Sequence, residues 1–315
     1  MTLPTAVASQ APENPFSQLI LDCDNNPNEI QCRYETHRSN RKALFKGKLL
    51  STDFDGWQID EILRKLILAQ EVAATTPNGN GEAPFVDHRH NLNFYARPPE
   101  HIREIVAEIQ RELRVIMPTL WFSPQESLHI TTLEVTSSRT AEEVDTLATH
   151  LHEKTGAASK LVNYTTSPHH RARLVKPMLN YDASAMALSF LPAAGEPTNH
   201  SLQNDAYSYH HLRRDLADQV LSTGITLGAR YVVPSAHITV ARFVSQDGGD
   251  VESVKKLVEG IERVNEMLRE KYWPKESAMP AKGEWVVGEV EGLEFNKGTS
   301  WYGAGERVLV GKGFE

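Results

Sequence analysis

The sequence predicts an α+β fold built from two similar lobes, and three observations lead to this prediction. Predicted strands and helices alternate twice between residues 91 and 310. Each round contains one strand with nearly the same sequence, Ser-x-His-Ile-Thr, which indicates a duplicated unit, although the rest of the two halves does not match. The chain has 315 residues, 40% hydrophobic and 23% charged, which is enough to bury a sizeable core.

The overall charge restricts the class of partner. A net charge of −8 and a pI of about 5.9 argue against a protein that follows a long nucleic-acid backbone, because such proteins need a basic face. We therefore expect no DNA partner. A pocket for one nucleotide or for an RNA end remains compatible with this charge, because a local field can oppose the global one.

The cysteines and apolar runs indicate the compartment. Cys23 and Cys32 are the only cysteines, and we expect them to be free thiols in a reducing environment. Residues 1–15 do not resemble a secretory signal, and no apolar run is long enough to cross a bilayer. We expect a soluble protein of the cytoplasm, with the nucleus as the alternative, and no membrane partner.

The first 85 residues are predicted to be an extension outside the duplicated unit. Residues 1–15 are polar and contain proline, which indicates a disordered tail. A helix is predicted over residues 57–69, where apolar residues recur near a 3.6 period after potential caps at residues 51–53. It should end before residues 75–83, which have the composition of a linker. The chain is thus divided into an extension, 1–85, and a bilobal domain, 86–315.

The bilobal domain is predicted to contain seven strands and four helices. The strands are residues 91–96, 128–135, 173–180, 185–191, 236–243, 285–295 and 307–310. The helices are residues 100–116, 141–151, 205–221 and 251–271. Residues 191–204 are predicted to be a loop.

Two of the predicted strands carry the residues that point to chemistry. Both contain His-Ile-Thr, at positions 129–131 and 237–239. One further His-x-Ser/Thr match, at His37, lies in a polar stretch without strand character. Alternate residues of a strand share a face, so His129 should point the same way as Thr131, and His237 the same way as Thr239. If the two strands face each other across a cleft, two imidazoles and two hydroxyls converge there.

Such a set of side chains suits the cleavage of a phosphodiester. The pKa of imidazole is near 6.5, so one ring can accept a proton from water while the other donates one to the leaving oxygen. The threonine hydroxyls can donate hydrogen bonds to the non-bridging oxygens. This scheme needs no metal and no cofactor. The alternative is that all four are ordinary polar strand residues with satisfied hydrogen bonds.

The paired His-Ile-Thr strands resemble the 2H phosphoesterase superfamily, which includes bacterial 2′,5′ RNA ligase-like proteins and eukaryotic cyclic nucleotide phosphodiesterases. Residues 237–243, His-Ile-Thr-Val-Ala-Arg-Phe, are close to the family's second motif. The strand at residues 91–96, followed by Pro98-Pro99 and a helix, is similar to its opening. The resemblance covers about residues 90–312. It implies two pseudo-symmetric lobes, each an antiparallel sheet with packed helices, and an active cleft between them.

The activity implied by this resemblance is metal-independent hydrolysis of 2′,3′-cyclic phosphates, or of related 2′ phosphodiesters, in nucleotides or RNA ends. The residues that match the family's motif are His129, Thr131, His237 and Thr239, which are therefore the candidate catalytic residues. The sequence does not decide which histidine is the acid. Two alternatives stay open: a 2′,5′ RNA ligase that runs the reverse reaction, and a nucleotide- or RNA-binding module with little turnover. The oligomeric state is also open.

Three further residues are candidates for binding the substrate. Tyr95, on the opening strand, could stack on a base, although packing in the core is the commoner fate of such a residue. Arg242 could contact the phosphate, but strand parity puts it on the face opposite His237, so a bulge would be needed. Tyr302 lies in the Gly-rich segment GTSWYGAG, which is either a lid or a simple hairpin connection.

Two other clusters of polar residues are interpreted as having no functional role. Arg38, Arg41, Lys42, Lys46 and Lys48 form a basic stretch that could meet an RNA strand, but such a run is more often a solvated face. The residues at 87–90, Asp-His-Arg-His, resemble metal ligands but are better explained as the polar end of a linker. No metal site is predicted.

Overall fold

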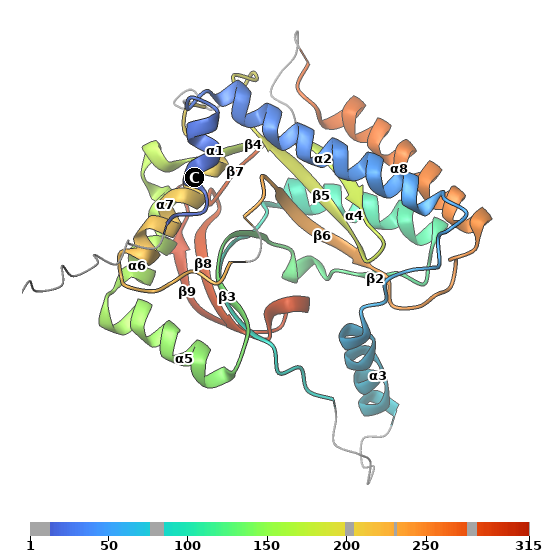
Figure 1. The fold of residues 1–315 in the computed structure, drawn as a ribbon, viewed down its shortest axis with the longest axis horizontal. Coiled ribbons are helices and arrows are strands. Elements are labelled where there is room, and N and C mark those ends of the chain that lie inside the picture. The colour runs from blue at the N-terminus through green and yellow to red at the C-terminus, as the bar shows by residue number, and fades with distance from the viewer. Residues whose placement is uncertain (1–12, 76–84, 199–204, 230–231, 276–281, 315) are drawn as a thin grey trace, which may run out of the picture.

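The computed structural model describes residues 13–75, 85–198, 205–229, 232–275 and 282–314 (Figure 1). It contains two antiparallel sheets with helices packed against them, which confirms the α+β prediction with two sheet lobes. Within these described ranges, none of the helices is both long and apolar enough to cross a membrane.

The first sheet has four strands in the order β3-β1-β8-β9. The strands are β1 (His90–Ala96), β3 (Ile130–Arg139), β8 (Glu291–Gly298) and β9 (Glu306–Lys312). Three helices contact it: α5 (Ala141–Thr149), α6 (Ala157–Val162) and α7 (Tyr209–Leu221). Thr140 and Glu143 form a capping box that starts α5, and a π-helical turn, His150–Lys154, follows this helix.

The second sheet has five strands in the order β2-β6-β5-β4-β7. The strands are β2 (Trp121–Phe122), β4 (Arg173–Tyr181), β5 (Ala185–Pro192), β6 (Ala236–Arg242) and β7 (Trp285–Val286). Helices α4 (Glu100–Ile116) and α8 (Val251–Tyr272) pack on each other and on this sheet. Although α4 follows β1 of the first sheet in the chain, its Gln110 donates to the carbonyl of Val240 in β6. The chain therefore crosses repeatedly from one lobe to the other.

The N-terminal extension forms three helices: α1 (Ser17–Asp22), α2 (Pro27–Leu49) and α3 (Glu61–Thr75). The 23-residue helix α2, capped by Asn26, lies across β4 and β5 (Figure 1). It buries Ile30, Tyr34 and Leu49 on its sheet-facing side. By contrast, α3 projects away from the two sheets (Figure 1).

Several predicted boundaries in the extension were wrong. The helix predicted over residues 57–69 begins only at Glu61, because Trp57 stacks on Phe243 (centroids 3.9 Å apart) and holds the preceding segment against the end of β6. Residues 13–15, predicted to belong to a disordered tail, are fixed through Asn14, which donates to the carbonyl of Arg214 and to Asp218. The remainder of that tail, and residues 76–84 of the predicted linker, lie outside the described residues.

Three boundaries in the bilobal domain also differ. The strand predicted over residues 285–295 is split into β7 and β8, because the chain turns at Gly288 (φ +82°) and passes from the second sheet to the first. The helix predicted from residue 205 starts at Tyr209, where the Ser208 side chain caps it. The loop predicted over residues 191–204 begins later, because Leu191 and Pro192 belong to β5; residues 199–204 lie outside the described part.

Two adjacent histidines of α7 join this helix to the extension. The buried ring of His210 donates from Nε2 to the carbonyl of Phe16 at 3.0 Å and accepts at Nδ1 from the hydroxyl of Tyr34 at 2.9 Å. His211 contacts Asn25 through Nε2 at 2.6 Å. Burial, with the positive charge of Arg213, lowers the pKa of His210 to about 3; burial and Arg214 lower that of His211 to about 4. Both rings are therefore neutral in the folded protein at pH 7.

These lowered pKa values predict a loss of stability in mild acid. Below pH 6.5 the unfolded chain protonates these histidines while the folded chain does not, so the free energy of unfolding should fall by about 1.4 kcal/mol per pH unit for each of them. Urea unfolding between pH 6.5 and 5 measures this slope. The slope should be shallower in His210→Asn than in the control His169→Asn, whose ring is exposed. Equal slopes for the two variants would contradict the assignment.

Candidate active site

One cavity of about 340 Å³ lies between the two sheets, where β3 and β6 approach each other. Its lining includes all seven residues selected from the sequence: Tyr95, His129, Thr131, His237, Thr239, Arg242 and Tyr302. The structure thus brings together side chains from both His-Ile-Thr segments. Their catalytic or binding roles remain predictions.

His129 lies immediately before β3, with its ring at the cavity wall. Its Nδ1–H donates to the backbone carbonyl of Ser127 at 2.8 Å, since a carbonyl can only accept, and this leaves the lone pair on Nε2. The ring packs against Tyr95, with centroids 3.9 Å apart. Leu128 and Ile130, on either side, are buried and anchor the backbone in the core. The orientation and tautomer of His129 are therefore both fixed.

A buried ion pair holds the segment before His129. Arg97 pairs with Glu294 at 2.7 Å, and its Nη1 also donates to the carbonyl of Leu128 at 3.3 Å. Burial opposes ionisation of Glu294, but hydrogen bonding to Arg97 and the charges of Arg97 and Arg307 outweigh it and lower the pKa of the carboxyl. The ion pair therefore persists at neutral pH and supports the backbone from which His129 projects.

His237 lies inside β6, and the neighbouring Ala236 and Ile238 are buried in the core. Its Nδ1 lies 3.0 Å from the hydroxyl of Ser235. The two histidines are thus held through the same ring nitrogen, one by a carbonyl and the other by a hydroxyl. The Ser that precedes each histidine by two residues supplies both contacts, which gives a structural reason for the repeated Ser-x-His spacing.

Thr131 and Thr239 share the cavity with the two rings. Within the described residues neither threonine hydroxyl has a hydrogen-bond partner in the protein, so both can donate to a ligand. The backbone carbonyl of Thr131 accepts from the hydroxyl of Tyr209 at 2.8 Å, which ties β3 to α7. The hydroxyls are therefore positioned by the backbone rather than by contacts of their own.

Both histidines of the cavity have a lowered pKa. Burial is the main cause in each case, and the pKa of each ring is about 4. The positive charges of Arg97 and Arg242 act on His129, and those of Arg213 and Arg242 act on His237. In the ligand-free protein both rings are neutral at pH 7. An anion bound between them would favour the protonated form and raise the pKa of the ring it touches.

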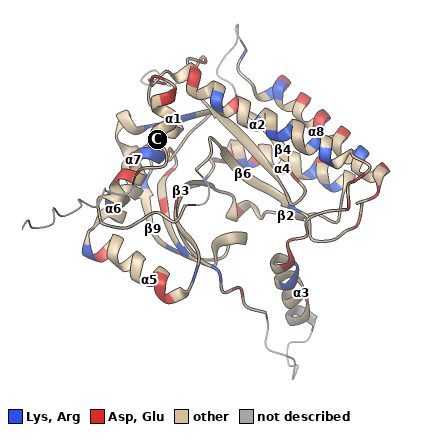
Figure 2. Ribbon diagram, viewed as in Figure 1, with Lys and Arg blue, Asp and Glu red and all other residues tan. Residues whose placement is uncertain are grey.

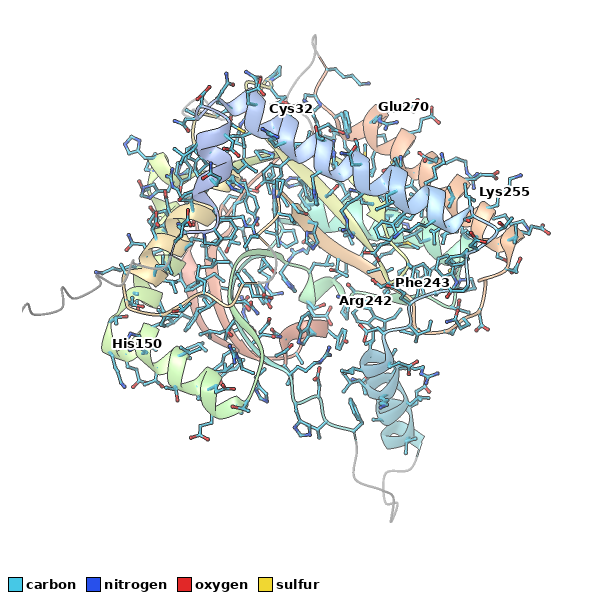
Figure 3. All side chains as sticks on the ribbon, in the orientation of Figure 1. Cys32, His150, Arg242, Phe243, Lys255 and Glu270 are labelled. Atoms are coloured by element: carbon cyan, nitrogen blue, oxygen red, sulfur yellow. The ribbon has the colours of Figure 1, made fainter. Side chains whose placement is uncertain are left out.

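Arg242 reaches the cavity because β6 contains a bulge, which reverses the alternation of side chains between the two faces of the strand. Thr239 pairs with Ala187 of β5, whereas Ala241 pairs with the next residue, Met186, so Val240 is an extra residue in β6. Beyond this irregularity, Arg242 points to the same side as His237 and lines the cavity. Figure 3 shows Arg242 and Phe243 at the end of β6, beside the start of α3.

The extension contributes Asp60 to the rim of the site. Asp60 Oδ1 caps α3 by accepting from the backbone N–H of Leu63, and it accepts from the Tyr302 hydroxyl at 2.6 Å. Its other oxygen lies 3.4 Å from Arg242 Nη1. Arg89, paired with Asp87 at 2.8 Å, also donates to the Tyr302 hydroxyl, at 3.0 Å. Tyr302 lies in a short 3₁₀ helix, Ser300–Tyr302, within the hairpin connection that joins the antiparallel strands β8 and β9.

Replacing Asp60 by alanine should therefore weaken substrate binding more than chemistry. Arg242 and Tyr302 would lose a shared anchor, and we expect KM to rise so that kcat/KM falls about tenfold, with kcat changed less. Steady-state kinetics measures the two constants separately. Asp55→Ala, an exposed carboxylate in the same segment, is the control. A fall in kcat with constant KM would show that Asp60 has a different role.

Tyr95 lies behind His129 rather than in the open part of the cavity. The residue is 5% exposed, and its hydroxyl donates to the Ser300 hydroxyl at 3.0 Å and accepts from Asn93. Burial raises the pKa of this hydroxyl to about 12. The packing alternative for Tyr95 is favoured, and its contact with the His129 ring makes it a candidate positioning residue.

Arg213 lines the cavity but was not predicted from the sequence. It lies in α7, and its guanidinium donates to the carbonyl of Val233 and sits 4.3 Å from the ring centroid of Phe16. Both contacts are made by distant segments, so no local pattern marks the residue.

The basic stretch of α2 does not form a continuous cationic face. Lys42 and Lys46 both pair with Glu262 of α8, at 2.7 and 3.2 Å. Lys and Arg along α2 and α8 are interspersed with Asp and Glu (Figure 2). Arg38 and Arg41 line the second cavity described below. In the described part of the chain, no three His, Cys, Asp or Glu side chains are grouped closely enough to hold a metal ion.

Comparisons with known proteins give little support to any assignment. No protein-family model and no curated protein sequence matches the chain. Among solved structures, the chain is similar to Usb1 of Kluyveromyces marxianus, determined with uridine monophosphate. The identity is 15%, the match covers 71% of this chain and 96% of that one, and the TM-score of 0.33 is too low to carry an argument about fold or activity.

Proposed function

We propose that this chain is a metal-independent phosphodiesterase that hydrolyses a 2′,3′-cyclic phosphate, or a related 2′ phosphodiester, of a nucleotide or an RNA end. The observation that supports this proposal is the convergence of His129 and His237, each fixed through Nδ1, with two threonine hydroxyls in one cavity. An acid and a base on opposite sides of one anion are what in-line displacement at phosphorus requires.

In the proposed reaction, one neutral imidazole takes a proton from water through Nε2 as the water oxygen attacks phosphorus. The bond from phosphorus to one ring oxygen breaks, and the other histidine, in its protonated form, gives its proton to that oxygen. The products are a 2′- or 3′-phosphomonoester and the adjacent free hydroxyl. After each turnover the histidine that acted as the base is protonated and the one that acted as the acid is neutral. Proton exchange with solvent restores the starting state.

Charge on the phosphate would be met by groups that line the same cavity. The hydroxyls of Thr131 and Thr239 would donate to the non-bridging oxygens, where negative charge increases in the transition state. Arg242 and Arg213 supply positive charge to the site although the whole chain is acidic. In the free protein Arg242 lowers the pKa of both imidazoles and Arg213 lowers that of His237, and a bound phosphate would oppose this effect.

The direct test is turnover of the four nucleoside 2′,3′-cyclic monophosphates, and of a short RNA with a 2′,3′-cyclic end, in excess chelator. We expect hydrolysis of at least one of them, and the product isomer identifies the bond that is cut. Failure on all of these substrates and on a 2′,5′-linked dinucleotide, or activity only after a divalent metal is added, would overturn the proposal. Addition of an RNA with a 5′-hydroxyl end would reveal any joining by the reverse reaction.

A further inference from the structure

A second cavity, of about 210 Å³, adjoins the first. It lies between α2 and the cleft side of β4 and β5, where α2 crosses these strands (Figure 1). His237, Thr239 and Arg242 line both cavities. A ligand held at the second His-Ile-Thr segment can therefore extend in two directions, toward His129 or under α2.

Two residues that line this cavity carry polar atoms without hydrogen-bond partners among the described residues. His37 Nε2, from α2, and Asn180 Oδ1, from β4, are buried and have no hydrogen-bond partner among the described residues. Buried polar atoms are nearly always paired, because an unpaired one costs about 1–3 kcal/mol. Burial and the charge of Arg41 lower the pKa of His37, so its neutral ring offers one donor and one acceptor. The cavity is thus equipped for a polar, hydrogen-bonding ligand.

The charged groups around this cavity favour a ligand with a phosphate. Arg38 is buried and already engaged by Glu35 and by the carbonyl of Lys176. Arg41 is only partly buried, and its contact with Asp182 at 3.1 Å is a solvent-exposed ion pair, which a phosphate could replace at little cost. Its charge also acts on His237, which places it within electrostatic range of the reacting phosphate. The buried ring of Tyr34, held by His210, also lines the cavity.

We propose that the cavity under α2 is a subsite for a second nucleotide, so that the preferred substrate is a dinucleotide or longer RNA end rather than a mononucleotide. This inference rests on the proposed phosphodiesterase function. It assigns a purpose to α2: the helix closes one side of the site and adds recognition groups that the two His-Ile-Thr segments do not provide.

The test compares two substrates with the same cyclic end, a nucleoside 2′,3′-cyclic monophosphate and a dinucleotide whose inner linkage is blocked by 2′-O-methylation. The wild type should cleave the dinucleotide with a kcat/KM about tenfold higher. His37→Leu should remove this preference and leave the mononucleotide rate within about twofold, and Arg41→Ala should also remove the preference. Lys48→Ala, an exposed cation near the end of the same helix, is the control.

The His37→Leu variant also distinguishes a role of His37 in ligand recognition from a role in folding. Replacing an unpaired buried nitrogen by an apolar group of similar size should leave the thermal stability unchanged or higher. Loss of dinucleotide preference together with loss of stability in both cavity variants would instead indicate a structural role. Equal kcat/KM for the two substrates in the wild type would overturn the subsite.

Binding measurements keep this inference distinct from the proposed function. Calorimetry with the two product analogues, a nucleoside 3′-monophosphate and the 2′-O-methylated dinucleotide 3′-phosphate, requires no turnover. If the wild type hydrolyses neither substrate but binds the dinucleotide about tenfold more tightly, and His37→Leu abolishes that difference, the subsite stands and the catalytic proposal fails. Equal affinities would refute the subsite whether or not the chain is an enzyme.

Discussion

Replacing either His129 or His237 by alanine is expected to lower kcat for a 2′,3′-cyclic substrate by about 10²–10⁴-fold, the range seen for positioned acid and base groups. Each ring handles one proton of the same displacement, so removing the second after the first should cost much less than the product of the two effects. Turnover in excess chelator, measured for both single variants and the double variant, tests this. KM should change far less than kcat, since Arg242 and the threonine hydroxyls remain.

The matched control is His169→Asn, which removes an exposed imidazole in a 3₁₀ helix far along the chain from either His-Ile-Thr segment. It should retain wild-type kcat and KM. Near-wild-type turnover in either active-site variant, with the fold intact by circular dichroism, would exclude a two-histidine mechanism. It would also favour the alternative that the four motif residues are ordinary strand residues.

The pH dependence of kcat/KM should be displaced to the acid side of an ordinary histidine profile. The kcat/KM limbs report the free enzyme, in which burial lowers the pKa of both rings to about 4. One ring must be protonated, so above about pH 5 kcat/KM should fall roughly tenfold per pH unit. The kcat optimum should lie at higher pH, because the bound phosphate stabilises the imidazolium. A kcat/KM that is constant between pH 5 and 8 would contradict this account.

Removing the positive charge of Arg242 tests whether this charge lowers the pKa of the two histidines. Arg242 lowers the pKa of both histidines, so Arg242→Gln should move the limbs of the kcat/KM profile to higher pH while it raises KM. A shift in the opposite direction would show that Arg242 acts on the profile through something other than its charge. Because the two rings interact, the limbs belong to the pair and not to one residue.

The elements that carry the candidate chemistry were predictable because their patterns are local. β6 and α8 match the predicted residues to within one position at either end, and β3 differs by only a few. His129 and His237 were found through a repeated triplet in which buried Ile130 and Ile238 alternate with the polar residues. Alternation of this kind reflects the backbone geometry of a strand, so it can be recognised without knowing which strand pairs with it.

The features that could not be predicted from the sequence depend on contacts between distant segments. Helix α2 was not predicted as a 23-residue helix, because its inner face mixes Ile30 and Tyr34 with Arg38 and the polar residues that line a cavity. That face lacks the apolar stripe by which helices are recognised. The bulge at Val240 that redirects Arg242 is visible only in the pairing of β6 with β5. Arg213 and Asp60 reach the site from segments with no catalytic pattern.

The crossing of the chain between the two sheets has a consequence for any attempt to divide the protein. A cut between β5 and α7 would leave β1 and β3 on one fragment while β8 and β9, their partners, are on the other. The same cut would separate β4 and β5 from β6. Each fragment would carry one of the two histidines and neither would possess a complete sheet. If the proposed activity is correct, we therefore expect turnover only when both fragments are present and refold together.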